Sequence, residues 1–457
     1  MTIETALTAL NEVLGDRLSR SKPDLAQHGA SESHFAVMAP DAVLYPRATA
    51  DVAQAVRICG DHGCPVIGFG AGTSLEGHTA APRGGLSVDF RDMAALIAVN
   101  ASDMDVTVQP GMTREALNAA LRDTGLFFPV DPGANASLGG MASTRASGTT
   151  AVRYGTMREN VLALEVVTAE GQIIRTGTRA RKSSAGYDLT GLFVGAEGTL
   201  GLITELTLRL QGIPEATASA VCAFAGNEAA VQTVIETVQC GIPMARIEYL
   251  DAASIAAVNA HSGRSDPVTP HLFVEFHGSD AAVRSDAEAF GEIASGNGGA
   301  GFRWSTLEEE KRALWAARHA AYYAILASRP GARAVVTDVC VPISALAQAM
   351  GDTQDDLASA SIPGPILGHV GDGNYHAILL IDPESSAEKD EALALQGRMV
   401  ERAQALGGTA TGEHGVGMGK LGYMEAEHGG AWALMGAIKR ALDPQGTMNP
   451  GKLVRQN

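Results

Sequence analysis

The sequence predicts an α+β protein built from three successive segments. Up to about residue 213, short β-like runs alternate with helical runs and glycine-rich loops. From Pro214 onward, alanine-rich helical stretches alternate with β-runs and no phosphate-type loop separates them, a pattern typical of helices packed on an antiparallel sheet. From about residue 409 the chain is again rich in glycine. We therefore expect segments at 1–213, 214–408 and 409–457, within the two or three domains that 457 residues suggest at about 150 residues each.

The first segment contains elements that can be justified in order. DAVLYPRATADVAQAVRICGDHG predicts a strand followed by an amphipathic helix that ends at Gly63. PVIGFGAGTSLEG predicts a strand that runs into a glycine loop, and GLSVDF and DVTVQP predict further strands. VLALEVVTAEGQIIRTG predicts a hairpin with Glu170 and Gly171 in its turn. ITELTLRL alternates apolar and polar residues, as a half-buried strand does, and Pro214 ends it.

The central segment mixes the two element types evenly. NEAAVQTVIETVQCG and DAASIAAVNAHSG predict helices, and NGGAG (297–301) predicts an internal turn. The predicted strands are ASAVCAF, HLFVEFHG, ARAVVTDVCVP and HAILLIDP.

Composition and charge exclude several classes of protein. The formal net charge of −17 is incompatible with the basic face that nucleic-acid binding needs. No run of about 18 apolar residues predicts a membrane span. The first 20 residues have no apolar signal core, and Glu4, Glu12 and Asp16 are unlike a transit sequence, so we expect a cytoplasmic location, with peripheral contact to an inner membrane left open. Five cysteines without a CxxC motif predict buried, reduced thiols.

Glycine-rich loops are the first candidate functional feature. GFGAGTSLEG (68–77) does not match GxGxxG, and no GxxxxGK[ST] motif occurs. Its small residues and the hydroxyls of Thr73 and Ser74 could instead form a nest for a pyrophosphate, although an ordinary turn explains the loop equally well. The loop at 131–155 is long, nearly uncharged and rich in hydroxyls, and such loops are rarely mere connectors. Together with GAEGTLGLITE (195–205) and NPGK (449–452), they favour a large anionic cofactor.

The same loops carry a resemblance to a known family. PVIGFGAGTSLEGH, DPGANASLGGMASTRASGTTAVRYGTMREN and GYDLTGLFVGAEGTLGLITELTLRL resemble the flavin-binding segments of the vanillyl-alcohol oxidase type FAD fold. The last two are similar to the branch of FAD-dependent D-lactate and other D-2-hydroxyacid dehydrogenases. TDVCVPIS, GHVGDGNYHA, GTATGEHGVGMGK and GTMNPGK extend the resemblance over nearly the whole chain. It implies a split FAD-binding domain, to which the C-terminal segment returns, and a central substrate domain on an antiparallel sheet.

The resemblance also implies which residues bind FAD. Because the typical linking position is not a histidine here, we expect a non-covalent cofactor and a structural role for His78. The implied FAD-binding residues are Gly68, Gly70, Ala71, Gly72, Thr73, Ser74, Pro132, Gly133, Ala134, Leu138, Gly139, Gly140, Ser147, Gly148, Tyr154, Gly155, Glu197, Gly198, Gly201, Ile203 and Asn449.

Two short motifs, HVGDGNYH and TGEHGVG, hold the candidate metal ligands. A Gly-Asp-Gly-Asn turn between two short strands would bring His369 and His376 to the same side. Two histidines and one carboxylate suit a divalent ion with positions open to substrate, yet neighbouring histidines are more often structural, so the pattern leaves both readings open. The resemblance implies that His369, His376 and Glu413 hold a divalent metal, Zn²⁺ or Mn²⁺.

The candidate catalytic residues follow from the chemistry that the resemblance implies. Hydride transfer from a 2-hydroxy acid needs loss of the hydroxyl proton, which a metal assists and a histidine can accept near neutral pH; His414 is the candidate base. Arg318 is implied as the carboxylate anchor, and Asn374 could donate a hydrogen bond to the substrate unless it serves only the turn. Relatives acting on 2-hydroxyglutarate tend to carry a lysine where this chain has Val336, so we expect a monocarboxylate.

The sequence therefore predicts FAD- and metal-dependent oxidation of a D-2-hydroxy acid, D-lactate in the first place, to the 2-keto acid by hydride transfer to flavin. Three alternatives stay open: a glycolate-oxidising subunit of a multi-subunit complex, a D-lactate oxidase using oxygen, and a flavin-free metal-dependent hydrolase. The expected partners are the small acid and an electron acceptor, namely a cytochrome, a quinone or an electron-transfer flavoprotein. Nucleic acid is not expected, and a homodimer is left open.

Overall fold

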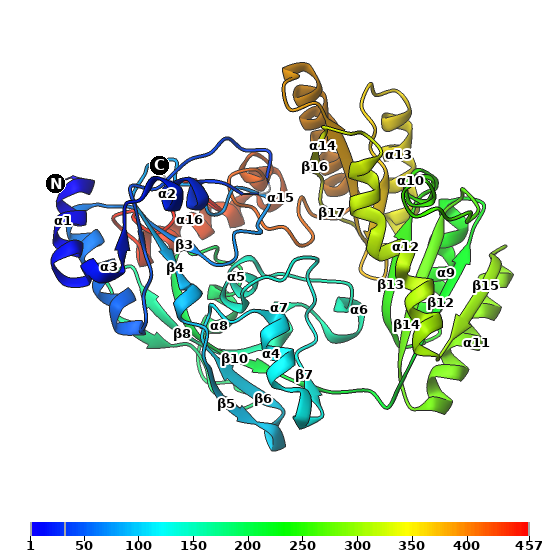
Figure 1. Ribbon diagram of the computed structural model, residues 1–457, viewed down its shortest axis with the longest axis horizontal. Coiled ribbons are helices and arrows are strands. Elements are labelled where there is room, and N and C mark those ends of the chain that lie inside the picture. Colours follow the sequence, from blue (N-terminus) through cyan, green and yellow to red (C-terminus); the bar gives the residue numbers. More distant parts are fainter. Residues whose placement is uncertain (1, 32, 456–457) are drawn as a thin grey trace. The chain divides into compact units, whose positions relative to one another are not determined.

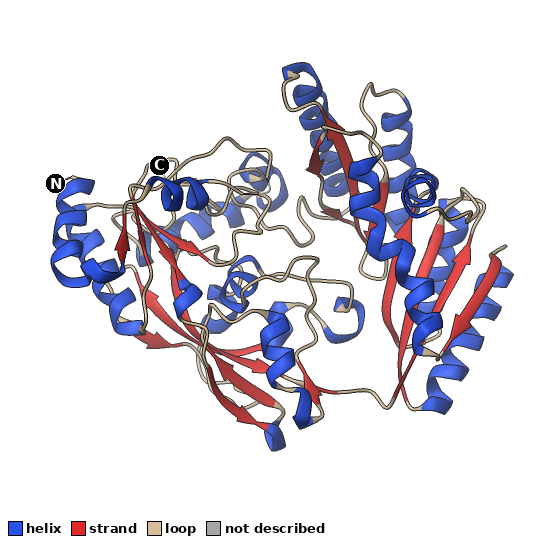
Figure 2. Cartoon of the chain, in the orientation of Figure 1, coloured by secondary structure: helices blue, strands red, loops and turns tan. Residues whose placement is uncertain are grey.

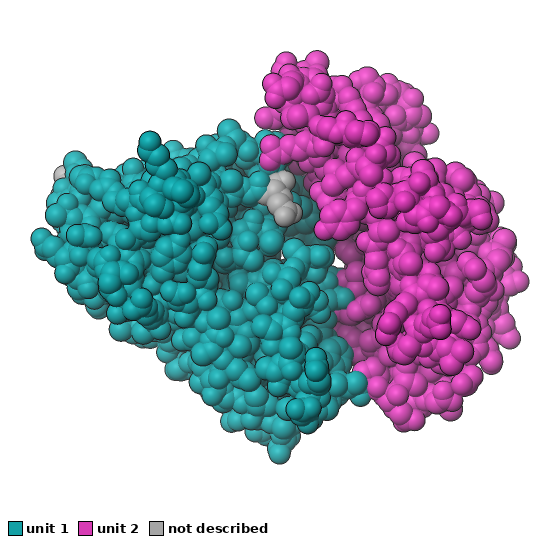
Figure 3. Space-filling view, viewed as in Figure 1, with its two compact units in different colours: residues 1–148, 155–213, 413–457 teal, residues 149–154, 214–412 magenta. Residues whose placement is uncertain are grey.

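The computed structural model describes residues 2–31 and 33–455, and they form two compact units. Unit 1 comprises Met1–Gly148, Gly155–Ile213 and Glu413–Asn457, and unit 2 comprises Thr149–Tyr154 and Pro214–Gly412 (Figure 3). Helices and mainly antiparallel sheets build both units, which confirms the predicted α+β class. Within the described ranges, none of the helices is long and apolar enough to cross a membrane.

A four-stranded sheet in the order β1-β2-β4-β3 forms one layer of unit 1. Two parallel pairings join β2, β4 and β3, because the predicted helix α3 crosses from β2 to β3 and buries Val52 and Val56. This helix ends at Gly63 in the left-handed conformation (φ 65°), as predicted. The elements are α1 (Ile3–Leu14), β1 (Leu18–Ser19), α2 (Lys22–Gly29), β2 (Ala42–Leu44), α3 (Thr49–His62), β3 (Val66–Phe69) and β4 (Leu86–Asp89).

The second sheet of unit 1 has five antiparallel strands in the order β5-β6-β10-β8-β9 (Figure 1). The predicted hairpin is confirmed, since β8 pairs with β9 across the turn that holds Gly171 (φ 72°). Alternate residues such as Leu206 and Leu208 face a core that Leu138 and Met141 also enter. The elements are β5 (Leu96–Asn100), β6 (Asp105–Val108), α4 (Arg114–Ala120), α5 (Leu138–Thr144), α7 (Met157–Asn160), β8 (Val161–Thr168), β9 (Ile173–Arg175), α8 (Leu189–Phe193) and β10 (Gly201–Arg209), with the small pair β7 (Leu126–Phe127) and β11 (Gln211–Gly212).

The C-terminal segment completes unit 1. Met448 forms a parallel bridge with Val66 of β3, so the chain end extends the first sheet. The buried ammonium of Lys439 donates to the carbonyls of Thr199 (2.6 Å) and Met448 (2.8 Å) and pairs with Asp443. The contact with Thr199 ties the segment to the glycine-rich loop at 195–205 of the same unit. Its helices are α15 (Met424–His428) and α16 (Gly430–Leu442).

Unit 2 is built on an eight-stranded sheet in the order β15-β12-β14-β13-β18-β19-β16, with β17 pairing with β19. All of its strand pairs are antiparallel, which confirms the sheet type predicted for the central segment. The strands are β12 (Ala216–Ala223), β13 (Met244–Leu250), β14 (His271–Gly278), β15 (Ala300–Ser305), β16 (Arg333–Val336), β17 (Val339–Cys340), β18 (Ile366–His369) and β19 (Asn374–Ile381).

Helices cover both faces of this sheet (Figure 2). Phe273 of β14 meets Trp315 on one face, with ring centroids 6.2 Å apart, and Phe276 meets Phe290 on the other, at 6.1 Å. Residues three apart on a strand point to opposite faces, so the two aromatic pairs mark the two layers. Trp315 belongs to α12 and Phe290 to α11. The helices are α6 (Ala151–Tyr154), α9 (Asn227–Gln239), α10 (Ala252–Ser262), α11 (Asp280–Gly296), α12 (Glu308–Ala327), α13 (Leu346–Ala358) and α14 (Ser386–Ala405).

The cysteines only partly match the prediction of buried thiols. Cys59, Cys64 and Cys222 are buried and reduced, but Cys240 is exposed and Cys340 is half-buried. Cys240 is the C-cap of α9, where the chain leaves the helix and the side chain is exposed.

Candidate active site

The β18–β19 hairpin places three of the predicted site residues on one face of the unit 2 sheet. His369 lies opposite Asn374, and Leu367 lies opposite His376, in the antiparallel register. Cross-strand neighbours point to the same face, so His369, Asn374 and His376 share it. The imidazole centroids are 5.6 Å apart. The turn between the strands contains Gly373 with φ 79°, a conformation that favours glycine.

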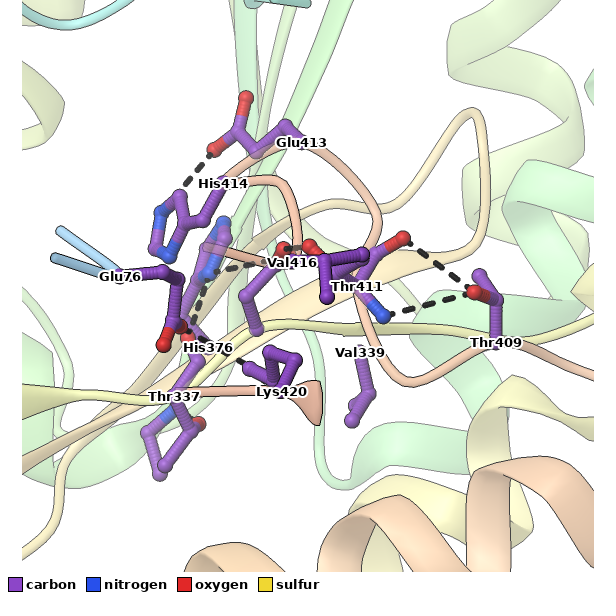
Figure 4. A network of polar contacts seen from close by, with 12 residues as sticks. Glu76, Thr337, Val339, His376, Thr409, Thr411, Glu413, His414, Val416 and Lys420 are labelled. Carbon is purple, nitrogen blue, oxygen red and sulfur yellow. Dashed lines mark hydrogen bonds and ion pairs between the residues drawn. The ribbon is translucent and has the colours of Figure 1, made fainter. Parts of the chain in front are cut away.

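Both histidines are held through Nδ1. His376 Nδ1 lies 2.8 Å from the carbonyl oxygen of Thr337, both drawn in Figure 4, and His369 Nδ1 lies 2.7 Å from Glu248 Oε1. A carbonyl oxygen and a carboxylate can only accept, so each Nδ1 carries a proton, and in the neutral imidazole the lone pair is then on Nε2. Metal-bound histidines in proteins usually have this second hydrogen bond. The donor set therefore fits a metal.

Glu248 connects this pair to Arg318. The carboxylate is fully buried. Arg318 of α12 donates to Oε2 through Nε at 2.9 Å, and its Nη2 forms an ion pair with the same oxygen at 2.7 Å. Burial alone would raise the pKa of Glu248, but the neighbouring His369 and Arg318 outweigh it, so the pKa is lowered. Glu248 was not predicted from the sequence. It could have been noticed as an acidic residue between the apolar residues Ile247 and Tyr249.

Asn374 has a different role from the one expected. Its Nδ2 donates to Asp338 Oδ1 at 2.7 Å and to the carbonyl of Val339 at 2.9 Å, which uses both amide hydrogens. The expectation that Asn374 donates to the substrate is therefore wrong in this geometry. Its Oδ1 is buried and has no hydrogen-bond partner in the described part of the chain, so the side chain offers an acceptor. Asp338, fully buried, also accepts from Thr411 Oγ1 at 2.7 Å.

Gly412 passes against the same side chains. A Cβ added to it would lie 2.1 Å from Asn374 Nδ2, so only glycine fits there. Glu413 is the next residue and begins the C-terminal part of unit 1. Glu413 Oε1 lies 3.8 Å from Nε2 of the adjacent His414, the candidate base (Figure 4).

The first two glycine loops pack on each other within unit 1. A Cβ added to Gly70 would lie 2.2 Å from Ser137 Oγ and 3.7 Å from the Cα of Gly140. Gly70 is thus required by the protein itself, whatever ligand the loop binds. Ser74 Oγ is buried without a hydrogen-bond partner among the described residues, and Gly72 has φ 73°. An orphaned buried hydroxyl in a glycine nest fits a bound phosphate group.

The third loop and the chain end meet at Glu197. Its carboxylate accepts from the backbone N–H groups of Val416 (2.7 Å) and Gly417 (2.9 Å). Asn449 Nδ2 donates to the carbonyl oxygens of Glu197 (2.7 Å) and His78 (3.2 Å). Burial would lower the pKa of His78, but Glu197, 3.2 Å away, raises it on balance. The structural role expected for His78 stays a prediction, because neither ring nitrogen has a hydrogen-bond partner among the described residues.

The other predicted FAD-binding positions divide unequally between the units. Tyr154 lies in unit 2, where its hydroxyl is 2.7 Å from His277 Nδ1, and His277 Nε2 is 2.7 Å from Glu275 Oε1. The rest lie in unit 1: Gly68, Ala71, Thr73, Pro132, Gly133, Ala134, Leu138, Gly139, Ser147, Gly148, Gly155, Gly198, Gly201 and Ile203.

Comparison with known proteins assigns the family. Residues 40–177 match the family described as FAD binding domain, and residues 213–453 match that described as FAD linked oxidases, C-terminal domain. The chain belongs to the family of FAD-linked oxidases. This oxidase is 49% identical over 457 residues to "Probable D-lactate dehydrogenase, mitochondrial" of Danio rerio, covering 99% of this chain and 92% of the relative. It is 43% identical over 451 residues to "D-lactate dehydrogenase [cytochrome], mitochondrial" of Arabidopsis thaliana, covering 98% and 80%.

Solved structures confirm the fold of the oxidase. The chain matches 4-ethylphenol oxidase from Gulosibacter chungangensis with a TM-score of 0.81, 20% identity and coverage of 98% of this chain and 96% of that one. It matches p-cresol methylhydroxylase with a TM-score of 0.77, 16% identity and the same coverage. At this identity the likeness shows the fold alone, which is the vanillyl-alcohol oxidase type predicted from the sequence.

The predicted cytoplasmic location is wrong. The relatives from Danio rerio and Arabidopsis thaliana are both named as mitochondrial, which points to the mitochondrion rather than the cytoplasm. The prediction depended on the absence of leader-like residues in the first 20 positions, and such an absence does not identify a compartment. The alternative of a flavin-free hydrolase also loses its basis, because two flavin-linked families together match most of the chain.

Proposed function

We propose that this FAD-linked oxidase oxidises D-lactate to the corresponding 2-keto acid. The relatives named D-lactate dehydrogenase, at 37–49% identity over nearly the whole chain, support the substrate. One observation carries the proposal: Glu248 is hydrogen-bonded to both Arg318 and His369, so a carboxylate anchor lies next to a metal-type histidine on one sheet face. A 2-hydroxy acid needs both, because its carboxylate and hydroxyl are on adjacent carbons.

FAD is proposed to bind non-covalently to the glycine loops of unit 1. The fit is supported by the buried, unsatisfied Ser74 hydroxyl beside the left-handed Gly72, and by the packing of Gly70 against Ser137 that brings two loops together. When bound, FAD supplies the hydride acceptor. The protein residues contribute by binding the acid, orienting its C2 carbon and taking up its hydroxyl proton.

A divalent metal, Zn²⁺ or Mn²⁺, is proposed to bind His369, His376 and Glu413. The Nδ1 hydrogen bonds of the two histidines present Nε2 as the ligand atom, and Glu413 would add a carboxylate oxygen. When bound, such an ion makes the substrate hydroxyl more acidic. This part of the proposal extends the chemistry beyond what the relatives' names state.

The remaining roles are proposed for residues beside this set. Arg318 would bind the substrate carboxylate through its Nη1–Nη2 edge, since its Nε edge faces Glu248, with a hydrogen bond from Nε and an ion pair at Nη2. His414 would accept the hydroxyl proton. Asn374 would offer Oδ1 to a donor on the substrate or on a bound water. Val336 in β16 replaces the lysine of relatives that act on dicarboxylates, which favours a monocarboxylate.

The electron acceptor is proposed to be a cytochrome, because relatives from Arabidopsis thaliana and Saccharomyces cerevisiae carry "[cytochrome]" in their names. A quinone, an electron-transfer flavoprotein or oxygen are the competing acceptors, and a homodimer is compatible with the proposal. A second substrate, glycolate, is favoured by one relative: "Glycolate oxidase subunit GlcD" of Bacillus subtilis is 35% identical over 420 residues, covering 91% of this chain.

A substrate and acceptor panel tests the proposal. The purified protein is assayed with D-lactate, L-lactate, glycolate and D-2-hydroxyglutarate, using an artificial acceptor, cytochrome c and oxygen in parallel. We expect bound FAD and the highest kcat/KM with D-lactate; faster turnover of glycolate would replace D-lactate by the second candidate. Dialysis against a chelator should abolish the activity and Zn²⁺ or Mn²⁺ should restore it. Full activity after complete metal removal would reject the metal site but not the FAD-linked oxidation.

A further inference from the structure

We infer that Glu248 is a positioning residue that fixes both the metal-ligating tautomer of His369 and the orientation of the Arg318 anchor. This inference depends on the proposed function, because it assigns a role toward the same metal and the same substrate carboxylate. Glu248 itself contacts neither: it would act only through its two neighbours.

The carboxylate divides its two oxygens between the two partners. Oε1 accepts from His369 Nδ1 at 2.7 Å, whereas Oε2 accepts from Arg318 Nε at 2.9 Å and forms an ion pair with Arg318 Nη2 at 2.7 Å. The Glu248 side chain has no exposed surface, and those of His369 and Arg318 are only 13% and 15% exposed. Each partner is thus held by a charged acceptor, and burial shields its hydrogen bond from replacement by water.

The sheet makes this arrangement rigid. In the register of β13 and β18, Tyr249 pairs with Gly368 and Leu250 with Leu367, so Glu248 comes opposite His369. Leu250 and Leu367, two residues along on the same face, belong to the core cluster that α12 covers. A carboxylate on an apolar sheet face is costly unless it is paired, and a buried ion pair gives little net stability compared with apolar residues. Stability therefore does not explain its presence.

The consequence for His369 is a fixed tautomer. Because a carboxylate cannot donate, Nδ1 must carry a proton, so in the neutral imidazole that binds a metal Nε2 is the lone-pair nitrogen. The negative charge also makes the imidazole a stronger ligand. His376 obtains the same tautomer from a backbone carbonyl, which no side-chain substitution can change. Glu248 is thus the member of the arrangement that a mutation can test.

The consequence for Arg318 is a fixed direction. Nε donates to Glu248 and Nη2 lies 2.7 Å from the same carboxylate oxygen, so the guanidinium turns its Nη1–Nη2 edge away from Glu248, the geometry for bidentate binding of a second carboxylate. One side chain therefore sets the spacing between the carboxylate anchor and a metal ligand. That spacing must match adjacent carbons of a 2-hydroxy acid, and errors of about 1 Å cost about 10²-fold in rate.

The substitution Glu248→Gln tests the inference, because glutamine has the same shape. Its amide can still accept from Arg318, but the amide nitrogen facing His369 donates, which forces the proton to Nε2 and removes the ligand lone pair. We expect the Kd for Zn²⁺, measured by competition with a chromogenic chelator, to rise by about 10–100-fold. We also expect a higher KM for D-lactate and unchanged FAD content.

Glu275→Gln provides a matched control on the neighbouring strand. Glu275 is half-buried, accepts from His277 at 2.7 Å and faces Arg246 at 3.6 Å, but it contacts none of the proposed ligands. Its substitution should leave the Kd for Zn²⁺ unchanged. An equal loss of metal affinity in both variants would show a general structural effect and overturn the inference.

The outcomes separate this inference from the proposed function. If the wild-type protein binds no divalent metal, the proposed metal site fails and the tautomer role of Glu248 fails with it. If the wild type binds metal and Glu248→Gln binds it equally well, with an unchanged KM, only the inference fails. Should Glu248→Gln not fold, Glu248→Asp repeats the test, because its shorter side chain cannot reach both partners. If Glu248→Asp binds Zn²⁺ with the wild-type Kd and has the wild-type KM for D-lactate, the inference is wrong.

Discussion

Lys452 allows one prediction to be worked out from the structure in detail. Its side chain is fully buried in the C-terminal segment of unit 1, where the ammonium donates to the carbonyl of Ala80 and to Asn449 Oδ1 (2.9 Å). Burial lowers the pKa of Lys452 to about 8, and the carboxylate of Glu197 offsets this only in part. The folded protein therefore holds this proton more weakly than the unfolded chain does.

The sign and size of the effect follow from proton linkage. Between the folded pKa of about 8 and the unfolded value of 10.5, the unfolded state binds more protons, so stability rises with pH across that window. Below about pH 8 both states are protonated and the penalty is constant. A difference of about 2.5 pKa units corresponds to about 3 kcal/mol at 1.36 kcal/mol per unit. We expect Lys452→Met to remove this alkaline gain.

Urea denaturation of the flavin-free protein gives the free energy of unfolding of wild type and variant at about pH 7.5 and about pH 10. The difference between the two proteins isolates Lys452, because the contributions of groups that titrate in both proteins cancel. The variant should gain stability at the lower pH relative to the wild type, by up to about 3 kcal/mol less the lost hydrogen bonds. Lys182→Met, at an exposed position of the same unit, should change nothing. An alkaline rise that is equal in Lys452→Met and in the wild type would refute the reasoning.

Two further predictions concern the candidate cofactor and substrate sites. Ser74→Ala removes a buried hydroxyl without a partner among the described residues, so the flavin-free protein should keep or gain stability while the Kd for FAD rises by about 5–150-fold, equivalent to 1–3 kcal/mol; an unchanged Kd in a flavin titration would exclude Ser74 from the site. Asn374→Asp places a second carboxylate 2.7 Å from Asp338 and should cost about 3 kcal/mol in thermal unfolding, whereas the exchanged pair Asn374→Asp with Asp338→Asn should recover most of it. No recovery in the double variant would show that the hydrogen bond is not what Asn374 contributes.

Local sequence patterns were enough to predict the helices and turns whose conformation depends on residues close in sequence. The amphipathic spacing before Gly63 gives α3, and the Glu170–Gly171 turn gives the β8–β9 hairpin, since neighbours in sequence determine both. The turn at Gly373 is of the same kind and brings His369 and His376 to one face. These features need no knowledge of the rest of the fold.

Residues whose role depends on distant partners could not be assigned in this way. Glu248 is 121 positions from His369, and only the pairing of β13 with β18 brings them together. The direction of the Asn374 amide depends on Asp338, 36 positions away, so the sequence could name the residue but not the atom that it offers. Gly70 was assigned to a ligand, while its closest neighbour is Ser137 of the protein itself.

The motif TGEHGVG shows how such distant contacts explain a short sequence. Gly412 must be glycine because of Asn374 in unit 2, and Gly417, with φ 48°, would place a Cβ 2.1 Å from the carbonyl oxygen of Glu76 in unit 1. The backbone is thus held closely on both sides of Glu413 and His414. Side chains that a ligand or a proton must find in a fixed place need such support from their backbone. The glycines of the motif therefore allow close packing of the backbone on both sides of Glu413 and His414, which are a metal ligand and a base in the function proposed here. This close packing restricts movement of the backbone that carries the two side chains.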